Sequence, residues 1–235
     1  LAEAGQALLP AARRMRDASA DIALTAAGRD RALAGTVRLT ASAVMAHHVL
    51  PPMIARLRRE LPRIAIELVA SDTSENLLYR DADIAVRMFR PTQLDIVARQ
   101  VGEMPIGIFA AHDYIARAGA PETLDAVTAH DLVGYDRSDL ILRGMRDMGW
   151  PATREWFSTR CDNQLVNWHL VCAGCGIGFA PLVVGRAEPR VQRLLPDVAL
   201  PALPAWLAAP QATRHTPRIA RVWESLARDL DAVLS

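Results

Sequence analysis

Two cysteines, Cys172 and Cys175, have the CxxC spacing found in zinc sites and in dithiol redox pairs. A zinc site needs two further ligands, and Cys161 and His169 are the nearest candidates in sequence. A redox pair usually begins a helix, where the helix dipole lowers the thiol pKa, whereas this pair lies at the end of a predicted helix. We therefore predict structural thiols, with neither a metal site nor a cofactor.

The glycines of Gly174–Gly178 resemble a phosphate-binding turn. A dinucleotide fingerprint requires the order strand, glycines, helix, but the predicted order here is helix, glycines, strand. We therefore expect a helix C-cap followed by a tight turn. The histidines form no HxxxH or HExxH pattern, there is no GxSxG elbow, and the absence of lysine excludes Schiff-base and Walker-A chemistry. Nothing in these motifs indicates an enzyme.

Small polar side chains recur where a predicted strand ends and a predicted helix begins. In open α/β sheets, ligands bind outside the carboxyl ends of the strands. At any single position an ordinary helix N-cap is the simpler interpretation, but several such positions together favour a small-molecule cleft. The candidate ligand-binding residues are Ser42, Ala43, Thr73, Arg87, Arg137, Ser138 and Asn163.

The amino-acid composition of the 235 residues is typical of a globular protein, with 51% hydrophobic and 23% charged residues. The 27 basic and 26 acidic residues leave a net charge of +1, which gives no electrostatic footprint for nucleic acid or an anionic membrane. An odd count of 3 cysteines does not make a disulfide scaffold. The sequence shows neither a membrane-spanning apolar run nor a secretion signal, so we predict a cytoplasmic protein without a membrane partner.

Residues 1–34 predict a long helix with an apolar seam at a spacing of three and four residues. The seam positions are Leu1, Ala4, Leu8, Ala11, Met15, Ala18, Ile22 and Thr25. Pro10 is the one residue that disrupts this pattern, and it should bend the helix or mark its start. Gly35 is a suitable end for the helix. Such a helix either lies on its own domain or pairs with a second copy of the chain. The narrow seam favours a dimerisation helix.

From residue 36 onward, apolar patterns alternate between strand and helix periods, which predicts an α/β fold with parallel sheets. Predicted strands span 37–41, 64–69, 83–87, 132–135, 154–160, 177–180, 191–195 and 205–209, and 95–111 is extended. Predicted helices span 45–61, 138–148, 163–173 and 217–234, with a short one after the capping box at 72–75. Two similar α/β sets joined by an extended crossing predict two lobes, 35–103 with 209–235 and 104–208.

Six segments, in this order and spacing, resemble the LysR-type transcriptional regulators. The first resembles the end of their DNA-binding domain and the start of the linker helix, the middle four resemble the first part of their effector domain, and the last resembles the helix, glycine turn and strand of its second lobe. These segments are residues 1–9, 39–42, 50–51, 61–68, 83–86 and 171–181. One departure is the stretch Leu77–Asp83, which lacks the glycine usual in that family.

The resemblance implies a two-lobed, periplasmic-binding-protein-like effector domain preceded by a dimerisation helix. A small molecule would bind between the lobes, and the chain would form a homo-dimer or tetramer. DNA would be bound only through an N-terminal winged helix-turn-helix domain that the sequence lacks. Two alternatives share this fold: a periplasmic solute-binding protein and an enzyme of the prephenate-dehydratase type.

Converging helix N-termini favour an anionic ligand, and Arg87 and Arg137 could add bidentate recognition of a carboxylate. We therefore expect an organic acid as the effector. Three acidic residues oppose this expectation, because a capping carboxylate could already neutralise its own helix end. These residues are Asp72, Asp136 and Asp162.

Overall fold

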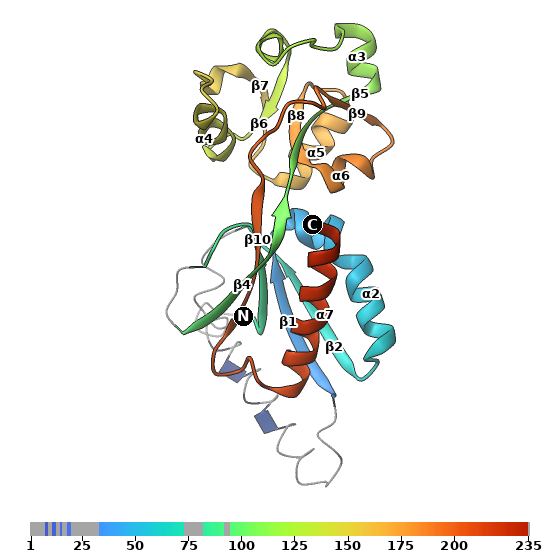
Figure 1. Cartoon of the computed structure of the whole chain (residues 1–235), viewed down its shortest axis with the longest axis vertical. Coiled ribbons are helices and arrows are strands. Elements are labelled where there is room, and N and C mark those ends of the chain that lie inside the picture. The colour runs from blue at the N-terminus through green and yellow to red at the C-terminus, as the bar shows by residue number, and fades with distance from the viewer. Residues whose placement is uncertain are drawn as a thin grey trace. The chain divides into compact units, whose positions relative to one another are not determined.

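The computed structural model describes residues 33–72, 82–91 and 95–234, together with residues 8, 11, 12, 15, 18 and 19 (Figure 1). The chain divides into two compact units. Unit 1 is Leu1–Glu103 with Pro204–Ser235, and unit 2 is Met104–Leu203. Unit 1 therefore resumes five residues before the expected boundary at 208/209. The reason is that strand pairing holds Trp206, Leu207 and Ala208 in its sheet.

Unit 1 contains a five-stranded sheet in the order β2-β1-β3-β10-β4. Its strands are β1 (Gly35–Ala41), β2 (Ile64–Ala70), β3 (Ile84–Arg87), β4 (Ile96–Met104) and β10 (Leu203–Pro210). β1 pairs in parallel with β2 and β3, as the alternating elements predict, whereas β10 runs antiparallel to β3. The carboxyl ends of the three parallel strands therefore lie at one edge of the sheet.

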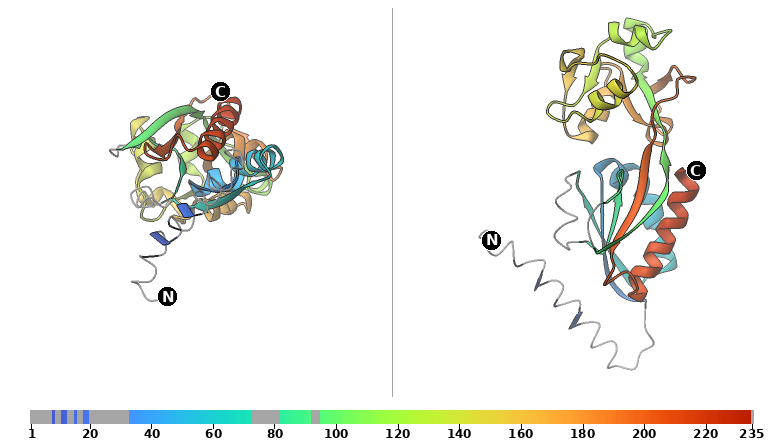
Figure 2. Two further views of the ribbon diagram at one scale, coloured as in Figure 1. Left: turned by 90° about the horizontal axis from the view of Figure 1, so that it is seen from below. Right: turned by 60° about the vertical axis from the view of Figure 1, so that its left-hand side comes forward.

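Two helical segments pack against the face of unit 1's sheet to which alternate residues of β1 contribute. Val37, Leu39 and Ala41 are each 0% exposed, because alternate residues of a strand share a face. A π-helical turn, η1 (Met45–Val49), leads into α2 (Leu50–Glu60), and α7 (Pro217–Leu234) lies alongside (Figure 2). The helices predicted over 45–61 and 217–234 are confirmed.

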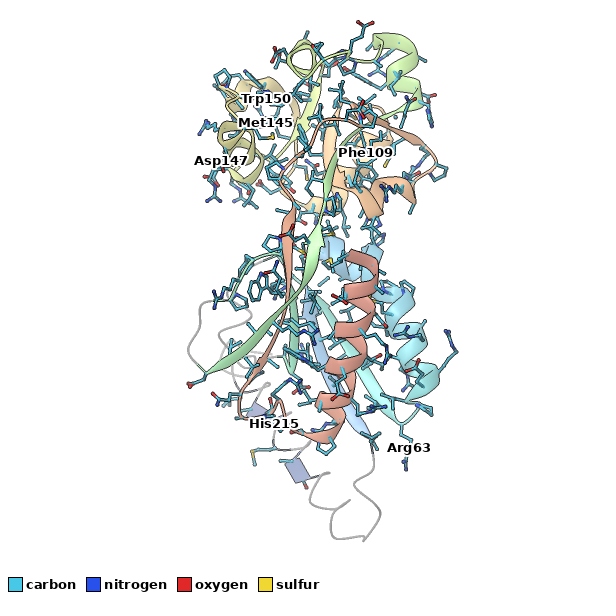
Figure 3. The ribbon with its side chains drawn as sticks, in the orientation of Figure 1. Arg63, Phe109, Met145, Asp147, Trp150 and His215 are labelled. Atoms are coloured by element: carbon cyan, nitrogen blue, oxygen red, sulfur yellow. The ribbon has the colours of Figure 1, made fainter. Side chains whose placement is uncertain are left out.

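Unit 2 combines an antiparallel sheet, ordered β8-β5-β9, with a parallel pair, β6-β7. The strands are β5 (Ile106–Ala111), β6 (Leu132–Gly134), β7 (Phe157–Arg160), β8 (Gly178–Pro181) and β9 (Val191–Leu194). The helices are α3 (His112–Ala118), α4 (Leu140–Asp147), α5 (Gln164–Cys172) and α6 (Leu182–Arg186), with 3-10 turns η3 (Asp125–Ala129) and η4 (Arg154–Trp156). Met145 and Trp150, labelled in Figure 3, belong to its apolar core.

Several expectations differ from the structure. In unit 2 the parallel arrangement holds for β6 with β7 and for a bridge between Leu132 and Ile177, whereas β5 runs antiparallel to both of its neighbours. The strand predicted over 154–160 begins as the 3-10 turn η4. Helices α3 and α6 were not predicted, since each follows a strand without an intervening turn. The short helix expected after residue 72 lies outside the described residues.

Within the predicted 1–34 helix, the described residues 8, 11, 12, 15, 18 and 19 are helical, whereas residues 33 and 34 are not. Among them, Leu8 is 67% and Met15 is 75% exposed in the single chain. Among the described residues, no helix is both long and apolar enough to cross a membrane.

Candidate functional site

In unit 1, the loops that follow β1 and β2 are joined by hydrogen bonds at the carboxyl edge of the sheet. The Ser71 N–H donates to the carbonyl oxygen of Ala41 at 2.8 Å, which extends the β1–β2 pairing by one residue. The Ala43 N–H donates to Asp72 Oδ1 at 2.9 Å. The Asp72 carboxylate therefore binds a backbone N–H at the start of the segment that leads into η1.

Ser42 acts as a cap for that helical segment. Its Oγ accepts a hydrogen bond from the Met45 N–H at 3.4 Å, and its carbonyl oxygen accepts one from the Ala46 N–H at 2.9 Å. Ser42 is 9% exposed, so most of its surface is covered within the chain. These contacts are those of the ordinary N-cap, the simpler interpretation that the sequence left open.

Arg87, the last residue of β3, joins the ends of the three parallel strands. Its Nη1 donates to the carbonyl oxygen of Ser71 at 3.0 Å, and its Nη2 donates to Thr40 Oγ1 at 3.0 Å. The residue is 2% exposed, and this burial lowers the pKa of its guanidinium, an effect that the charge of Asp72 opposes. The two Nη groups therefore hold the edge on which Ser42 and Asp72 lie.

Unit 2 repeats this arrangement at the ends of β6 and β7. The Asp162 carboxylate, just after β7, accepts hydrogen bonds from the N–H groups of Asp136, Arg137 and Ser138, each at 3.0 Å. Its Oδ2 also accepts from Arg137 Nε at 3.2 Å. These bonds lower the pKa of Asp162, the Ser138 N–H having the largest effect. Three successive N–H groups form an anion-binding nest, and the chain's own carboxylate occupies it.

Asn163 begins α5 as its N-cap. Its Oδ1 accepts hydrogen bonds from the N–H groups of Leu165 and Val166, both at 3.1 Å. The Arg137 side chain is 88% exposed, so much of its guanidinium faces solvent despite the bond to Asp162. Asp136 forms ion pairs with Arg154 and Arg160 rather than capping a helix.

The candidate residues therefore form two groups, one at each parallel strand pair. Unit 1 brings together Ser42, Ala43 and Arg87, and unit 2 brings together Arg137, Ser138 and Asn163. Thr73 lies outside the described residues. From the sequence, Asp72 and Asp162 are expected to cap the helices that follow them. In the structure, Asp72 binds the loop after β1 and Asp162 binds the loop after β6. Their common position, directly after the second strand of a parallel pair, is the signal that could have revealed this.

In the CxxC segment, Cys172 is buried and Cys175 is partly exposed. All three cysteines are free, and burial raises the pKa of Cys172 to about 11. Among the described residues, no three His, Cys, Asp or Glu side chains are placed to hold a metal ion. The Gly174 N–H donates to the Val171 carbonyl and the Cys175 N–H to the Leu170 carbonyl, both at 3.0 Å, which is a Schellman C-cap. The predicted helix C-cap at these glycines is confirmed.

Comparison with known families assigns the whole α/β region. The family described as LysR substrate binding domain matches residues 30–231. This chain belongs to that family. The resemblance drawn from the sequence is therefore confirmed.

Among curated proteins, this LysR-family chain is 28% identical over 207 residues to the HTH-type transcriptional activator AaeR of Escherichia coli (strain K12). That match covers 83% of this chain, which spans 65% of the length of AaeR. The HTH-type transcriptional regulator CrgA of Neisseria meningitidis serogroup C (strain 8013) is 27% identical over 101 residues, covering 43% of this chain and 34% of CrgA. The matched relatives are transcriptional regulators rather than enzymes.

Solved structures agree on the fold. The regulatory domain of Neisseria meningitidis CrgA has a TM-score of 0.72 at 21% identity, covering 86% of this chain and 100% of that domain. The full-length Vibrio cholerae virulence activator AphB has a TM-score of 0.69 at 18% identity, covering 97% of this chain and 79% of AphB. The LysR-family chain therefore has the periplasmic-binding-protein-like fold of these regulatory domains, and the predicted fold class is confirmed.

Proposed function

We propose that this chain is the effector-sensing part of a LysR-type transcription regulator whose effector is a small organic acid. The family match over residues 30–231 is the observation that supports the sensing role. In such a regulator, the α/β units bind the effector, and DNA is bound through a separate N-terminal winged helix-turn-helix domain. We place the whole protein in the cytoplasm as a homo-dimer or tetramer.

The basic residues support an acidic effector more strongly than the helix N-termini do. Asp72 and Asp162 already accept the backbone N–H groups after β1 and β6, so those groups are not free to bind a ligand. The Arg137 guanidinium is 88% exposed and keeps donors available for a carboxylate. We therefore propose that arginine side chains supply the recognition of the acid.

A thermal-shift screen of the chain tests this function. A ligand that binds only the folded state raises Tm by mass action. We expect organic acids to raise Tm and their neutral amides, simple amines and sugars to leave it unchanged. The screened compounds should be recovered chemically intact, because the role is binding rather than turnover. A screen in which only amines or uncharged compounds raise Tm would contradict the acidic effector.

Arg137→Gln should reduce the Tm shift given by an acid found in that screen. Arg143→Gln is the matched control, because Arg143 is also an exposed arginine of unit 2 with one ion pair, to Asp139. If both variants respond to the acid as the unmodified chain does, Arg137 does not contact the effector.

A further inference from the structure

The buried side chain of Asn167 in α5 joins the ends of β6 and β7. Its Nδ2 donates to the carbonyl oxygen of Gly134 at 2.7 Å and to that of Cys161 at 3.5 Å. Gly134 is the last residue of β6, and Cys161 follows the last residue of β7. Asn167 is 4% exposed, although asparagine is a residue type that mostly lies at the surface. One amide group therefore contacts both strands at the edge where they end.

This contact lies directly beside the Asp162 nest. Cys161 immediately precedes Asp162, and the N–H groups of residues 136–138, which donate to the Asp162 carboxylate, begin two residues after Gly134. The Cys161 N–H also donates to the Gly134 carbonyl oxygen, at 3.0 Å. The two loops are therefore held together at the point from which the nest begins.

Asn167 is itself fixed by the first turn of α5. Asn163 caps this helix, and its carbonyl oxygen accepts the Asn167 N–H at 2.8 Å. Side chains on helices are positioned more precisely than side chains on loops. The amide therefore connects two strand ends to a capped helix (Figure 1).

Unit 1 contains an equivalent joint made by a different residue type. Arg87, which is 2% exposed, donates from Nη1 to the carbonyl oxygen of Ser71 at 3.0 Å. Ser71 immediately precedes Asp72, as Cys161 precedes Asp162. In both units, a buried side-chain donor therefore holds the residue before the carboxylate that binds the neighbouring loop.

We propose that Asn167 is the positioning residue of the Asp162 nest and, through it, of the Arg137 side chain. By holding Gly134 and Cys161 together, its amide keeps the Asp162 carboxylate on the three N–H groups. Arg137 depends on this arrangement because both its N–H and its Nε donate to Asp162, the Nε at 3.2 Å. The link to the effector rests on the proposed function, in which Arg137 binds an organic acid. Asn167 then affects the affinity for the acid without contacting it.

Asn167→Ala tests this role through the titration of Asp162, followed by NMR of the carboxyl carbons. Asp162→Asn identifies the Asp162 signal by its loss. In the unmodified chain the pKa of Asp162 is lowered by backbone N–H groups, that of Ser138 first. We expect the pKa in Asn167→Ala to rise toward its ordinary value of 3.8, because the N–H groups are no longer held on the carboxylate. The Tm shift given by an acid from the screen should become smaller.

Val171→Ala is the matched control, because Val171 lies one turn further along α5 and is 1% exposed. It packs against Gly178 of β8 rather than against the strand ends. Both variants should lower Tm, since each loses buried contacts. Val171→Ala should leave the Asp162 pKa and the response to the acid unchanged. If Asn167→Ala fails to fold, Asn167→Ser is measured in its place, and the same rise is expected because a hydroxyl offers one donor instead of two.

The outcomes separate this role from the proposed function. If the Asp162 pKa is the same in the Asn167 variant as in the unmodified chain, or rises equally in Val171→Ala, Asn167 does not position the nest. If the pKa rises but the response to the acid is unchanged, the link to Arg137 is wrong. If the pKa rises and no acid raises the Tm of the unmodified chain, the positioning of Asp162 stands and the acidic effector fails.

Discussion

At the scale of single residues, carboxylates of the chain bind the backbone N–H groups beyond each parallel strand pair. Asp72 does so after β1 and Asp162 after β6, and each comes directly after the neighbouring strand. A carboxylate in this position joins the loops that follow the two strands of a parallel pair, because these strands end at the same edge of the sheet. The positive ends of these helical segments are thereby compensated within the fold, and recognition of an anion falls to side chains.

Replacing Asp162 with asparagine should destabilise the chain in a way that depends on pH. The hydrogen bonds lower the folded pKa of Asp162 below its ordinary value of 3.8. A lowered carboxyl pKa stabilises the folded state above the unfolded pKa, and this contribution is lost as the pH falls through the folded pKa. The Tm of Asp162→Asn should therefore lie below that of the unmodified chain at neutral pH, with the gap narrowing below about pH 4.

Asp147→Asn is the control for that measurement. Asp147 is an exposed residue of unit 2, and Figure 3 labels it at the end of α4. Its substitution should leave Tm unchanged at both pH values. Equal Tm values for Asp162→Asn and the unmodified chain at neutral pH would show that the Asp162 bonds do not stabilise unit 2.

Ser42→Ala should lower stability, because the Ser42 hydroxyl accepts a backbone N–H within the chain. Loss of an N-cap side chain costs about 1 kcal/mol of unfolding free energy. Ser138→Ala is the matched control, because Ser138 joins the Asp162 nest through its backbone N–H, which alanine keeps. Urea unfolding of both variants measures the difference. Similar unfolding free energies for the two would favour a ligand-facing hydroxyl at position 42.

Cys172 should be inert in the native chain. With a pKa of about 11, its thiolate fraction near pH 8 is on the order of one in a thousand. Iodoacetamide should therefore leave Cys172 unmodified until the chain is unfolded, as peptide mass spectrometry would detect. Rapid native alkylation, or a peroxide-induced disulfide at this residue, would overturn its assignment as a structural thiol.

At the scale of elements, the glycine turn between α5 and β8 combines two conformational demands. Gly174 closes the Schellman cap with a φ of +79°. Gly176 has a φ of +157°, and a Cβ added there would lie 2.4 Å from the carbonyl oxygen of Asp131. That oxygen accepts the Ile177 N–H at 2.8 Å, so the close approach belongs to the parallel bridge between Leu132 and Ile177.

Gly176→Ala should therefore destabilise the chain more than Gly149→Ala. Gly149 also has a positive φ, +85°, but a Cβ there meets nothing within 4 Å. Backbone strain alone costs about 1 kcal/mol at such positions, and a clash with backbone adds to it. Thermal unfolding of the two variants should give the larger loss of Tm for Gly176→Ala. Equal losses would mean that the loop moves to accommodate the methyl group.

Local sequence predicted the elements whose signals lie within one segment. The amphipathic period of 217–234, the C-cap at Gly174 and most strands are of this kind. The antiparallel pairing of β5 with β8 and β9 joins strands far apart in sequence, and local patterns contain no information on such partners. The same holds for the site. Caps at Ser42 and Asn163 follow from adjacent residues, whereas the bonds from Arg87 to Thr40 and Ser71 join strands that are separated in sequence.

At the scale of the whole molecule, the family region accounts for residues 30–231, and the segment before it requires a separate explanation. Leu8 and Met15 lie on the predicted seam, one heptad apart, and both are strongly exposed in the single chain. Exposed apolar side chains at this spacing are typical of a helix that pairs with another helix. We therefore propose that the seam of residues 1–34 pairs with the same seam of a second copy.

Replacing both Leu8 and Met15 with glutamate should weaken this association, because a charge in an apolar seam is left without a partner. Sedimentation velocity at micromolar concentration should show a dimer or larger species for the unmodified chain and a shift toward monomer for the double variant. Ala20→Glu is the control, because position 20 lies opposite the seam in the heptad and a charge there should leave the association unchanged. The α/β units contribute their own contacts if the double variant stays dimeric, whereas a monomeric unmodified chain would refute the dimerisation helix.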